Sequence, residues 1–289
     1  MNAPLSRSLA GTMRRAQPWL GTLVGIQATG LPPAQLARAI DRAFRAVARV
    51  HALMSFHEPD SELSRLNRTA HAGPVPVSGH LRRVLRAACR LSALTDGRFD
   101  VTVAPTLVRW GYLPGLPDST ETTGDWRDIR LGTDGMVSFA RPLLIDLGGI
   151  AKGYAVDLAI ASLRRAGVSQ ACVNAGGDLR FYGREPRRIG VRDPADPARL
   201  RLRLLPPLLQ GAVATSCVTD TRRRHGQTWR SPLIDPRSGQ ACAATGSVTV
   251  LARSCLYADA LTKPVAIDPV ACEPVLRRLQ AQALLLPAA

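Results

Sequence analysis

Residues 144–177 read LIDLGGIAKGYAVDLAIASLRRAGVSQACVNAGG and contain two apolar runs that each lead to a pair of glycines. The first run ends at Asp146, before Gly148-Gly149, and Lys152 follows where a helix is expected to begin. Glycines let a backbone approach a ligand closely, and a helix N-terminus offers unpaired N–H groups and the positive end of its dipole. The stretch therefore has the features of an anion-binding turn.

Two well-known nucleotide-binding loops do not match this turn. A P-loop requires G-x-x-x-x-G-K-[ST], whereas here Lys152 precedes Gly153. The dinucleotide fingerprint G-x-G-x-x-G is absent as well. Taken alone, the turn is more typical of an ordinary connection between a strand and a helix, so its function has to be inferred from the rest of the chain.

The composition is that of a globular protein, with 46% hydrophobic and 21% charged residues. No apolar run reaches the roughly 18 residues that cross a bilayer. Because the N-terminus has no apolar core of signal-peptide length, we expect a cytoplasmic location. We also expect a flexible tail over 1–17 and a single domain over 18–285. The six cysteines are scattered without a C-x-x-C pair, which favours buried thiols over a metal site.

The net charge of +16 raises nucleic-acid binding as an alternative. The arginines are spread over most predicted helices, only 222–224 form a dense run, and aromatic residues make up just 4%. This distribution is poor for base stacking. The basic residues are all arginine except Lys152 and Lys263. Against that background, the two lysines indicate positions that require a compact ammonium group.

Local patterns predict helices over 33–53 and 81–94 and a short helix capped by Asp60 or Ser61. A surface loop is expected over 114–128, and Pro264 disfavours helical geometry at Lys263. Short strands grouped with separate helices indicate an α+β fold. The predicted strands are 18–26, 54–56, 171–173, 189–191, 200–205, 211–215 and 246–252.

Ten short motifs follow one another along nearly the whole chain, from about Leu20 to Ala266. They are LGT at 20–22, SELSRLN at 61–67, TDGRFDVTVAP at 95–105, RWGY at 109–112, IDLGGIAKGYAVD at 145–157, VNAGGD at 173–178, ATS at 214–216, LIDPRSG at 233–239, SVTV at 247–250 and ADAL at 258–261. Each motif is weak alone, but in this order they resemble the ApbE family, the FAD:protein FMN transferases.

The resemblance implies a single α+β unit of the T-fold-like type, with mainly antiparallel strands and packed helices. It implies transfer of FMN from FAD to a threonine or serine hydroxyl of an acceptor flavoprotein, release of AMP, and Mg²⁺ near the pyrophosphate. Carried over by position, the cofactor-binding residues are Leu20, His57, Arg98, Phe99, Asp100, Asp146, Lys152 and Leu233, the metal ligands are the Gly149 carbonyl and Asp259, and the catalytic residues are Asp259 and Lys263.

Three departures from the family concern positions other than the metal ligands. Leu20 stands where the family usually has methionine, and His57 stands where it often has tyrosine. The family histidine three residues before the Asp-Pro turn is Pro232, which cannot accept a proton. Proton removal from the acceptor hydroxyl then needs another group, for which His225 is a conceivable substitute.

The fourth departure affects the metal. The family has a threonine ligand four residues after the aspartate, and here that position is Lys263. An ammonium cannot bind Mg²⁺, so we expect Lys263 to replace part of the metal's charge and to face the pyrophosphate together with Lys152. An ordinary i,i+4 pair with Asp259, which stabilises a helix by only about 0.2–0.5 kcal/mol, is the alternative.

Further alternatives stay open at the level of single residues and of function. Asp100 and Asp178 also suit turn or cap positions, and Asp259 suits a helix cap. With Pro232 and Lys263 in place, the chain also fits a non-catalytic FAD-binding protein or flavin carrier. An FAD pyrophosphatase, which would release FMN without an acceptor, is intermediate between a transferase and a non-catalytic FAD-binding protein.

Overall fold

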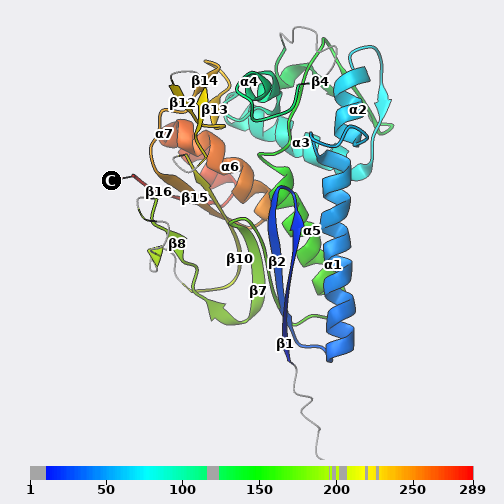
Figure 1. The fold of residues 1–289 in the computed structure, drawn as a ribbon, viewed down its shortest axis with the longest axis vertical. Coiled ribbons are helices and arrows are strands. Elements are labelled where there is room, and N and C mark those ends of the chain that lie inside the picture. The colour runs from blue at the N-terminus through cyan, green and yellow to red at the C-terminus, as the bar shows by residue number, and fades with distance from the viewer. Residues whose placement is uncertain are drawn as a thin grey trace, which may run out of the picture.

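Within the described residues, seven strands form the main sheet of the computed structural model, in the order β1-β2-β6-β7-β10-β15-β16 (Figure 1). The structure describes residues 11–115, 124–194, 196, 200–201, 207–218, 221–225 and 228–288. All neighbouring strands of this sheet are antiparallel, which confirms the predicted α+β class. The strands are β1 (Thr12–Trp19), β2 (Thr22–Thr29), β6 (Gln170–Ala175), β7 (Asp178–Arg187), β10 (Leu208–Cys217), β15 (Ser247–Ala252) and β16 (Gln282–Leu286).

The first strand differs from the prediction. Instead of one strand over 18–26, the chain forms the β1–β2 hairpin, and residues 12–17 of the expected tail belong to β1. The turn consists of Leu20 and Gly21, with φ values of 57° and 70°. Positive φ at both central residues is the requirement of a type I′ hairpin turn. The apolar run alone does not reveal such a turn.

Three long helices lie side by side and cover one face of the sheet (Figure 1). They are α1 (Pro33–Met54), α5 (Ala151–Arg165) and α6 (Cys255–Ile267). Apolar residues of α1 recur at three- and four-residue steps and are buried, as predicted. Contrary to expectation, α6 continues through Lys263 and Pro264, because its burial against α5 and the sheet outweighs the local preference of the sequence.

The remaining elements surround this layer. The predicted helix after Ser61 is α2, whose first turn donates a hydrogen bond from the Ser64 N–H to the Ser61 hydroxyl at 3.0 Å. The predicted strand 54–56 does not form, since Met54 ends α1 and a loop follows. The other helices are α2 (Glu62–Thr69), α3 (Gly79–Leu94), η1 (Val101–Val103), α4 (Ala104–Arg109), η2 (Trp126–Asp128) and α7 (Pro269–Arg278).

Short strands complete the chain. They are β3 (Val75–Pro76), β4 (Ile129–Leu131), β5 (Met136–Phe139), β8 (Val191–Arg192), β9 (Leu200–Arg201), β11 (Arg223–His225), β12 (Thr228–Arg230), β13 (Ile234–Asp235) and β14 (Gln240–Ala241). Strands predicted over 171–173 and 211–215 are confirmed within β6 and β10, and residues 247–252 of the strand predicted over 246–252 form β15. Of the strand predicted over 189–191, only Val191 belongs to a strand, β8. Residues 202–205 of one predicted strand and 116–123 of the predicted loop lie outside the described residues. No helix in the described ranges has the length and apolarity to span a bilayer.

The beginnings of α5 and α6 are held in close contact. A Cβ atom added to Gly153 would lie 2.2 Å from the Cys255 carbonyl oxygen, so only glycine fits there. The Asp157 carboxylate of α5 accepts hydrogen bonds from the Cys255 and Leu256 N–H groups at 2.9 and 3.0 Å. These bonds satisfy two N–H groups that a helix N-terminus leaves without intrahelical partners, and they fix α6 against α5.

Candidate functional site

Four charged side chains from three elements meet where α5 and α6 begin. Lys152 comes from the first turn of α5, Asp178 from the start of β7, and Asp259 and Lys263 from successive turns of α6. The Lys152 ammonium lies 2.8 Å from Asp178 Oδ2 and 3.5 Å from Asp259 Oδ2. The Lys263 ammonium contacts Asp259 Oδ1 and donates to the Asp259 main-chain carbonyl at 2.8 Å. We call these four residues the floor cluster.

The carboxylates of the floor cluster are almost completely buried. The side chains of Asp259 and Asp178 are 1% and 5% exposed, whereas those of Lys152 and Lys263 are 29% and 22% exposed. The Gly153 N–H donates to Asp259 Oδ2 at 3.0 Å. Buried charges persist when they are paired and hydrogen-bonded, and both conditions hold here. The Asp259 side chain is therefore a fixed negative charge that holds two ammonium groups.

Burial and charge act in opposite directions on these groups. Burial disfavours the ionised form of Asp259, but Lys152 and Lys263 outweigh it and hold its pKa below the ordinary value. Burial likewise opposes the charge on Lys152, but Asp259 and Asp178 outweigh it and raise the pKa of that ammonium. Burial raises the pKa of Asp178, and the neighbouring charge of Asp259 adds to this effect. Asp259 and Lys152 are thus charged at neutral pH.

Two cavities meet above the floor cluster. The first has a volume of about 440 Å³ and the second about 450 Å³, within the range of small-molecule sites. Leu113, Asp146, Gly148 and Lys152 line both cavities. The first cavity has an apolar wall with Phe99 among its residues, which suits a planar aromatic ligand. A ligand with two different ends could therefore extend across the shared boundary.

The residues assigned by sequence lie around this pair of cavities. Arg98, Phe99, Asp100, Gly149, Leu233 and Lys263 line the first cavity, Leu20 and His57 line the second, and Asp146 and Lys152 line both. Asp259 is buried beneath them. Their roles toward FAD remain predictions, but the fold brings all of them to one place.

The three single-residue alternatives have different outcomes. Asp100 does cap η1, accepting from the Thr102 N–H at 2.9 Å, and it also lines the first cavity. Asp259 is not a cap, because the N-cap of α6 is Ser254. Asp178 caps no helix and pairs with Lys152 instead. The i,i+4 pair between Asp259 and Lys263, which is the alternative considered from sequence, is present, and Lys263 also lines the first cavity.

Asp146 is fixed by residues that motif reading did not single out. The side-chain amide of Asn67 donates to the Ile145 carbonyl and accepts from the Ile145 N–H, both at 2.9 Å. The Asp146 carboxylate then accepts from the Gly148 N–H at 3.0 Å, within the glycine turn. Burial raises the pKa of Asp146. The SELSRLN motif therefore contributes an asparagine that positions the boundary between the cavities.

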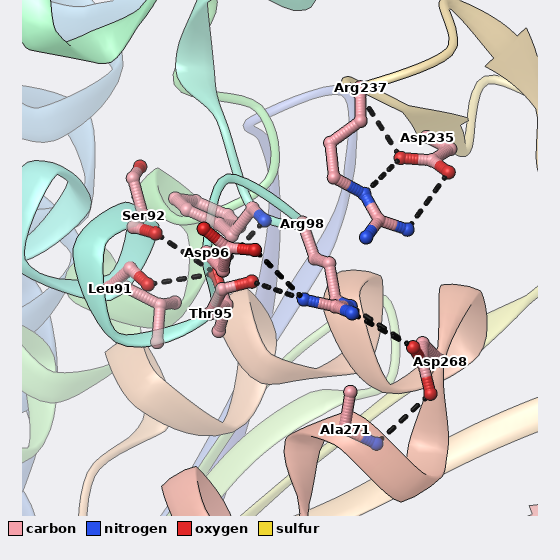
Figure 2. Close-up of polar contacts among 10 residues, drawn as sticks. Leu91, Ser92, Thr95, Asp96, Arg98, Asp235, Arg237, Asp268 and Ala271 are labelled. Carbon is pink, nitrogen blue, oxygen red and sulfur yellow. Dashed lines mark hydrogen bonds and ion pairs between the residues drawn. The ribbon is translucent and has the colours of Figure 1, made fainter.

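A second charged group includes Arg98, which lines the first cavity, and we call it the rim cluster: Arg98, Asp268, Asp235 and Arg237 (Figure 2). The Arg98 guanidinium donates from Nε and from a terminal nitrogen to Asp268 Oδ2, at 3.2 and 3.0 Å. The Arg237 guanidinium donates two hydrogen bonds to the Asp235 carboxylate, each 3.2 Å long. Figure 2 shows the two arginines on facing loops, each turned toward its own aspartate.

Pro232 lies in the wall of the first cavity, where the resemblance gives a histidine. Beside it, the Tyr112 hydroxyl donates to the carbonyl oxygens of Thr221 and Arg230, at 2.9 and 2.7 Å. These bonds tie the RWGY motif to the segment around β12. The side chain of His225, the substitute base considered from sequence, lies outside the described part of the chain. Pro232 itself can neither accept nor donate a proton.

From the sequence alone, Asp178 is predicted only as a turn or cap residue. The structural roles of Asn67 and Asp157 are not predicted at all. Asp178 directly follows the Gly176-Gly177 turn, so the VNAGGD motif already carried a signal for it. Asn67 and Asp157 had no such signal, because their partners are 78 and 98 residues away along the chain. Only the folded arrangement reveals these contacts.

The residues present do not fit Mg²⁺ at the position that the resemblance implies. Mg²⁺ requires near-octahedral coordination by oxygen atoms. Here the Asp259 carboxylate already binds Lys263 and the Gly153 N–H, and Lys263 Cε lies 3.3 Å from the Cβ position built on Gly149. Among the residues that the structure describes, no group of three His, Cys, Asp or Glu side chains could hold a metal ion. An ammonium group occupies the region between the two predicted ligands.

Comparison with known proteins supplies independent information about this site. A profile described as "ApbE family" matches residues 20–285. The chain is 30% identical over 262 residues to the FAD:protein FMN transferase of Vibrio cholerae, covering 84% of this chain and 78% of that protein. The structure of the Thermotoga maritima ApbE protein superimposes with a TM-score of 0.83 at 27% identity, covering 95% and 94% of the two chains. The flavin transferase ApbE of Vibrio cholerae gives 0.81 at 30% identity, covering 96% and 93%.

Proposed function

Because the chain belongs to the ApbE family, we propose that it transfers the FMN half of FAD to a threonine or serine hydroxyl of another protein, with release of AMP. The observation that carries this proposal is the pair of ammonium groups, Lys152 and Lys263, facing the first cavity beside the N-terminus of α5. Two cations and a helix N-terminus form a site for a diphosphate. The adjoining cavities suit its two organic ends.

The reaction follows from this arrangement. The acceptor hydroxyl oxygen attacks the phosphorus of the FMN half, the anhydride bond to AMP breaks, and the hydroxyl proton leaves. Phosphoryl transfer depends mainly on positioning and on stabilising charge at the phosphoryl oxygens. Lys152 and Lys263 can do this because Asp259 and Asp178 hold them before the substrate arrives. Preorganised positive groups lose little energy to reorganisation during the reaction.

Because Pro232 cannot accept a proton, another residue must remove the proton of the acceptor hydroxyl. Asp146 lines both cavities, and its carboxylate bonds a backbone N–H rather than an ammonium group. We therefore assign proton acceptance from the acceptor hydroxyl to Asp146. His57 lines the second cavity on the other side of this boundary.

A direct assay tests the proposed function. Purified protein is incubated with FAD and an acceptor protein that carries a modifiable threonine, and the products are resolved by denaturing gel and chromatography. We expect a fluorescent covalent adduct on the acceptor and an equal amount of AMP. Free FMN without an adduct would indicate a pyrophosphatase instead.

A second candidate function is supported by Pro232, which removes the family's proton acceptor from the cavity wall. A flavin carrier would bind FAD and release neither AMP nor FMN. Isothermal titration with FAD, followed by chromatography of the same sample, separates this function from catalysis. Intact FAD after prolonged incubation with several acceptors would favour the carrier over the transferase.

A further inference from the structure

Lys263 reaches the floor of the first cavity from within its own helix. Its ammonium contacts both the carboxylate and the main-chain carbonyl of Asp259, one helical turn earlier. Its Cε atom lies beside Gly149, in the turn that precedes α5. A cation held by oxygen atoms of Asp259, next to the Gly149 turn, is the arrangement that the resemblance assigns to a metal ion. In this chain the cation is part of the polypeptide.

The charges of the floor cluster are consistent with this replacement. The cluster places two ammonium groups against two carboxylates, and Asp259 contacts both ammonium groups. A lysine ammonium has three N–H donors, and Asp259 accounts for two of those on Lys263. The third is available to an oxygen of a ligand in the first cavity, which Lys263 lines.

The choice of lysine supports the same conclusion. Lys152 and Lys263 are the only lysines in the sequence, and both belong to the floor cluster. A guanidinium is planar and wider than an ammonium, so it fits poorly into a site that a small spherical cation would occupy. In the rim cluster, by contrast, arginine guanidinium groups pair with the carboxylates of Asp268 and Asp235.

We propose that the Lys263 ammonium takes the place of a divalent cation, so that this chain binds the diphosphate of FAD without a metal ion. This inference rests on the proposed function for the identity of the ligand. It also predicts that the site can be converted: a hydroxyl at position 263 would remove the ammonium and add an oxygen ligand beside Asp259.

Three variants test the inference. Lys263→Thr opens the site and supplies an oxygen, Lys263→Met opens it without a ligand, and Arg277→Met removes an exposed cation from the neighbouring helix α7 as a control. FAD affinity is measured by flavin fluorescence in EDTA and in Mg²⁺. Mn²⁺ binding is measured separately by electron paramagnetic resonance without FAD. Thermal melting establishes that each variant is folded.

For the unmodified protein and Arg277→Met, we expect equal FAD affinity in EDTA and Mg²⁺ and no Mn²⁺ bound at the site. Lys263→Thr should bind about one Mn²⁺ per chain and lose about tenfold in FAD affinity in EDTA, recovering it in Mg²⁺. Lys263→Met should lose affinity under both conditions. Mn²⁺ binding by the unmodified protein at this site, or its loss of FAD affinity on chelation, would overturn the inference, as would a folded Lys263→Thr that binds no Mn²⁺.

These readouts separate the inference from the proposed function. Neither FAD affinity nor Mn²⁺ binding requires an acceptor protein. Chelator-resistant FAD binding without adduct formation would therefore leave the inference intact and reject the transferase. If Lys263→Thr does not fold, the chelation and Mn²⁺ measurements on the unmodified protein still decide the question.

Discussion

The first cavity carries one charged cluster at its floor and another at its rim, and they differ in burial. The floor carboxylates Asp259 and Asp178 are 1% and 5% exposed, whereas the rim carboxylates Asp268 and Asp235 are 33% and 20% exposed. Solvent screens the rim pairs, so each contributes little to stability. A buried charge that loses its partner remains desolvated. Similar ion pairs should therefore respond very differently to the same substitution.

The cations also differ between the two clusters. The rim uses arginine, whose fork-shaped guanidinium forms paired hydrogen bonds with Asp268 and Asp235 (Figure 2). The floor uses lysine, whose compact ammonium reaches Asp178 and Asp259 in a confined space. The two clusters therefore differ both in the burial of their carboxylates and in the kind of cation that pairs with them.

Removing one floor carboxylate should have the largest effect. Asp259→Asn keeps the shape of the side chain but leaves Lys152 and Lys263 without its charge. We expect the free energy of unfolding to fall by about 3 kcal/mol, as for a broken buried ion pair, and FMN transfer to be lost. Urea denaturation measures the first effect and the gel assay the second.

The matched control is Asp268→Asn at the rim. Asparagine is also a good N-cap, so the bond from the Ala271 N–H that begins α7 should persist. Only a small decrease in the free energy of unfolding is expected for this solvent-screened pair. Equal losses for the two variants would contradict the distinction between floor and rim.

The next largest effect tests how the floor is assembled. Gly153→Ala places a methyl group against the Cys255 carbonyl and forces α5 away from α6. Overpacking of this kind typically costs about 1–3 kcal/mol, and here it should also weaken FAD binding by moving Asp259. Gly79→Ala is the control, because Gly79 is also near the start of a helix but has open space around it. It should leave both thermal stability and FAD affinity nearly unchanged.

The sequence alone does not distinguish the roles of these two glycines. Both occur near the start of a helix, and only the approach of Cys255 distinguishes Gly153. The helices α1 and α3 could be predicted because their apolar periodicity is local. The turn at Leu20-Gly21 and the continuation of α6 through Pro264 could not, since backbone geometry and burial by distant segments decide them.

The candidate site, too, could be predicted only in part from the sequence. The motifs were enough to select Asp146, Lys152, Asp259 and Lys263, which the fold brings to one cavity floor or boundary. They did not reveal that Asp178 pairs with Lys152, because a turn residue and a site residue look alike in sequence. The role of Lys263 could be framed only as two alternatives, and the structure shows features of both: an i,i+4 pair that also faces the cavity.

A third prediction concerns Asp146, a carboxylate beside the floor that bonds a backbone N–H. Burial raises its pKa, so the folded state holds this proton at a higher pH than the unfolded state does. The contribution of Asp146 to stability therefore falls as pH rises from the ordinary aspartate pKa through the raised value, and is constant above it. Asp146→Asn should remove this decline and be more stable than the unmodified protein at neutral pH, while FMN transfer is lost.

Urea denaturation across a pH series checks the sign of this effect. The stability difference between Asp146→Asn and the unmodified protein should vanish at acid pH and grow toward neutral pH. Burial also raises the pKa of Asp100 in the same cavity wall, so Asp100→Asn should show a stability difference of the same sign. A pH-independent difference for Asp146→Asn, or full transfer activity, would contradict the role assigned to Asp146.

The smallest effects are expected at the rim, where Arg98→Met and Arg237→Met can be compared. The Arg98 side chain is 16% exposed and binds both Asp268 and the Thr95 carbonyl, whereas Arg237 is 41% exposed and binds within its own turn. We expect a loss of up to about 1 kcal/mol for Arg98→Met and almost none for Arg237→Met. High salt should reduce the difference by screening the pair with Asp268. Because Arg98 also lines the first cavity, its replacement should weaken FAD binding modestly, which fluorescence titration can measure. A larger stability loss for Arg237→Met than for Arg98→Met would show that exposure does not rank the charges around this cavity.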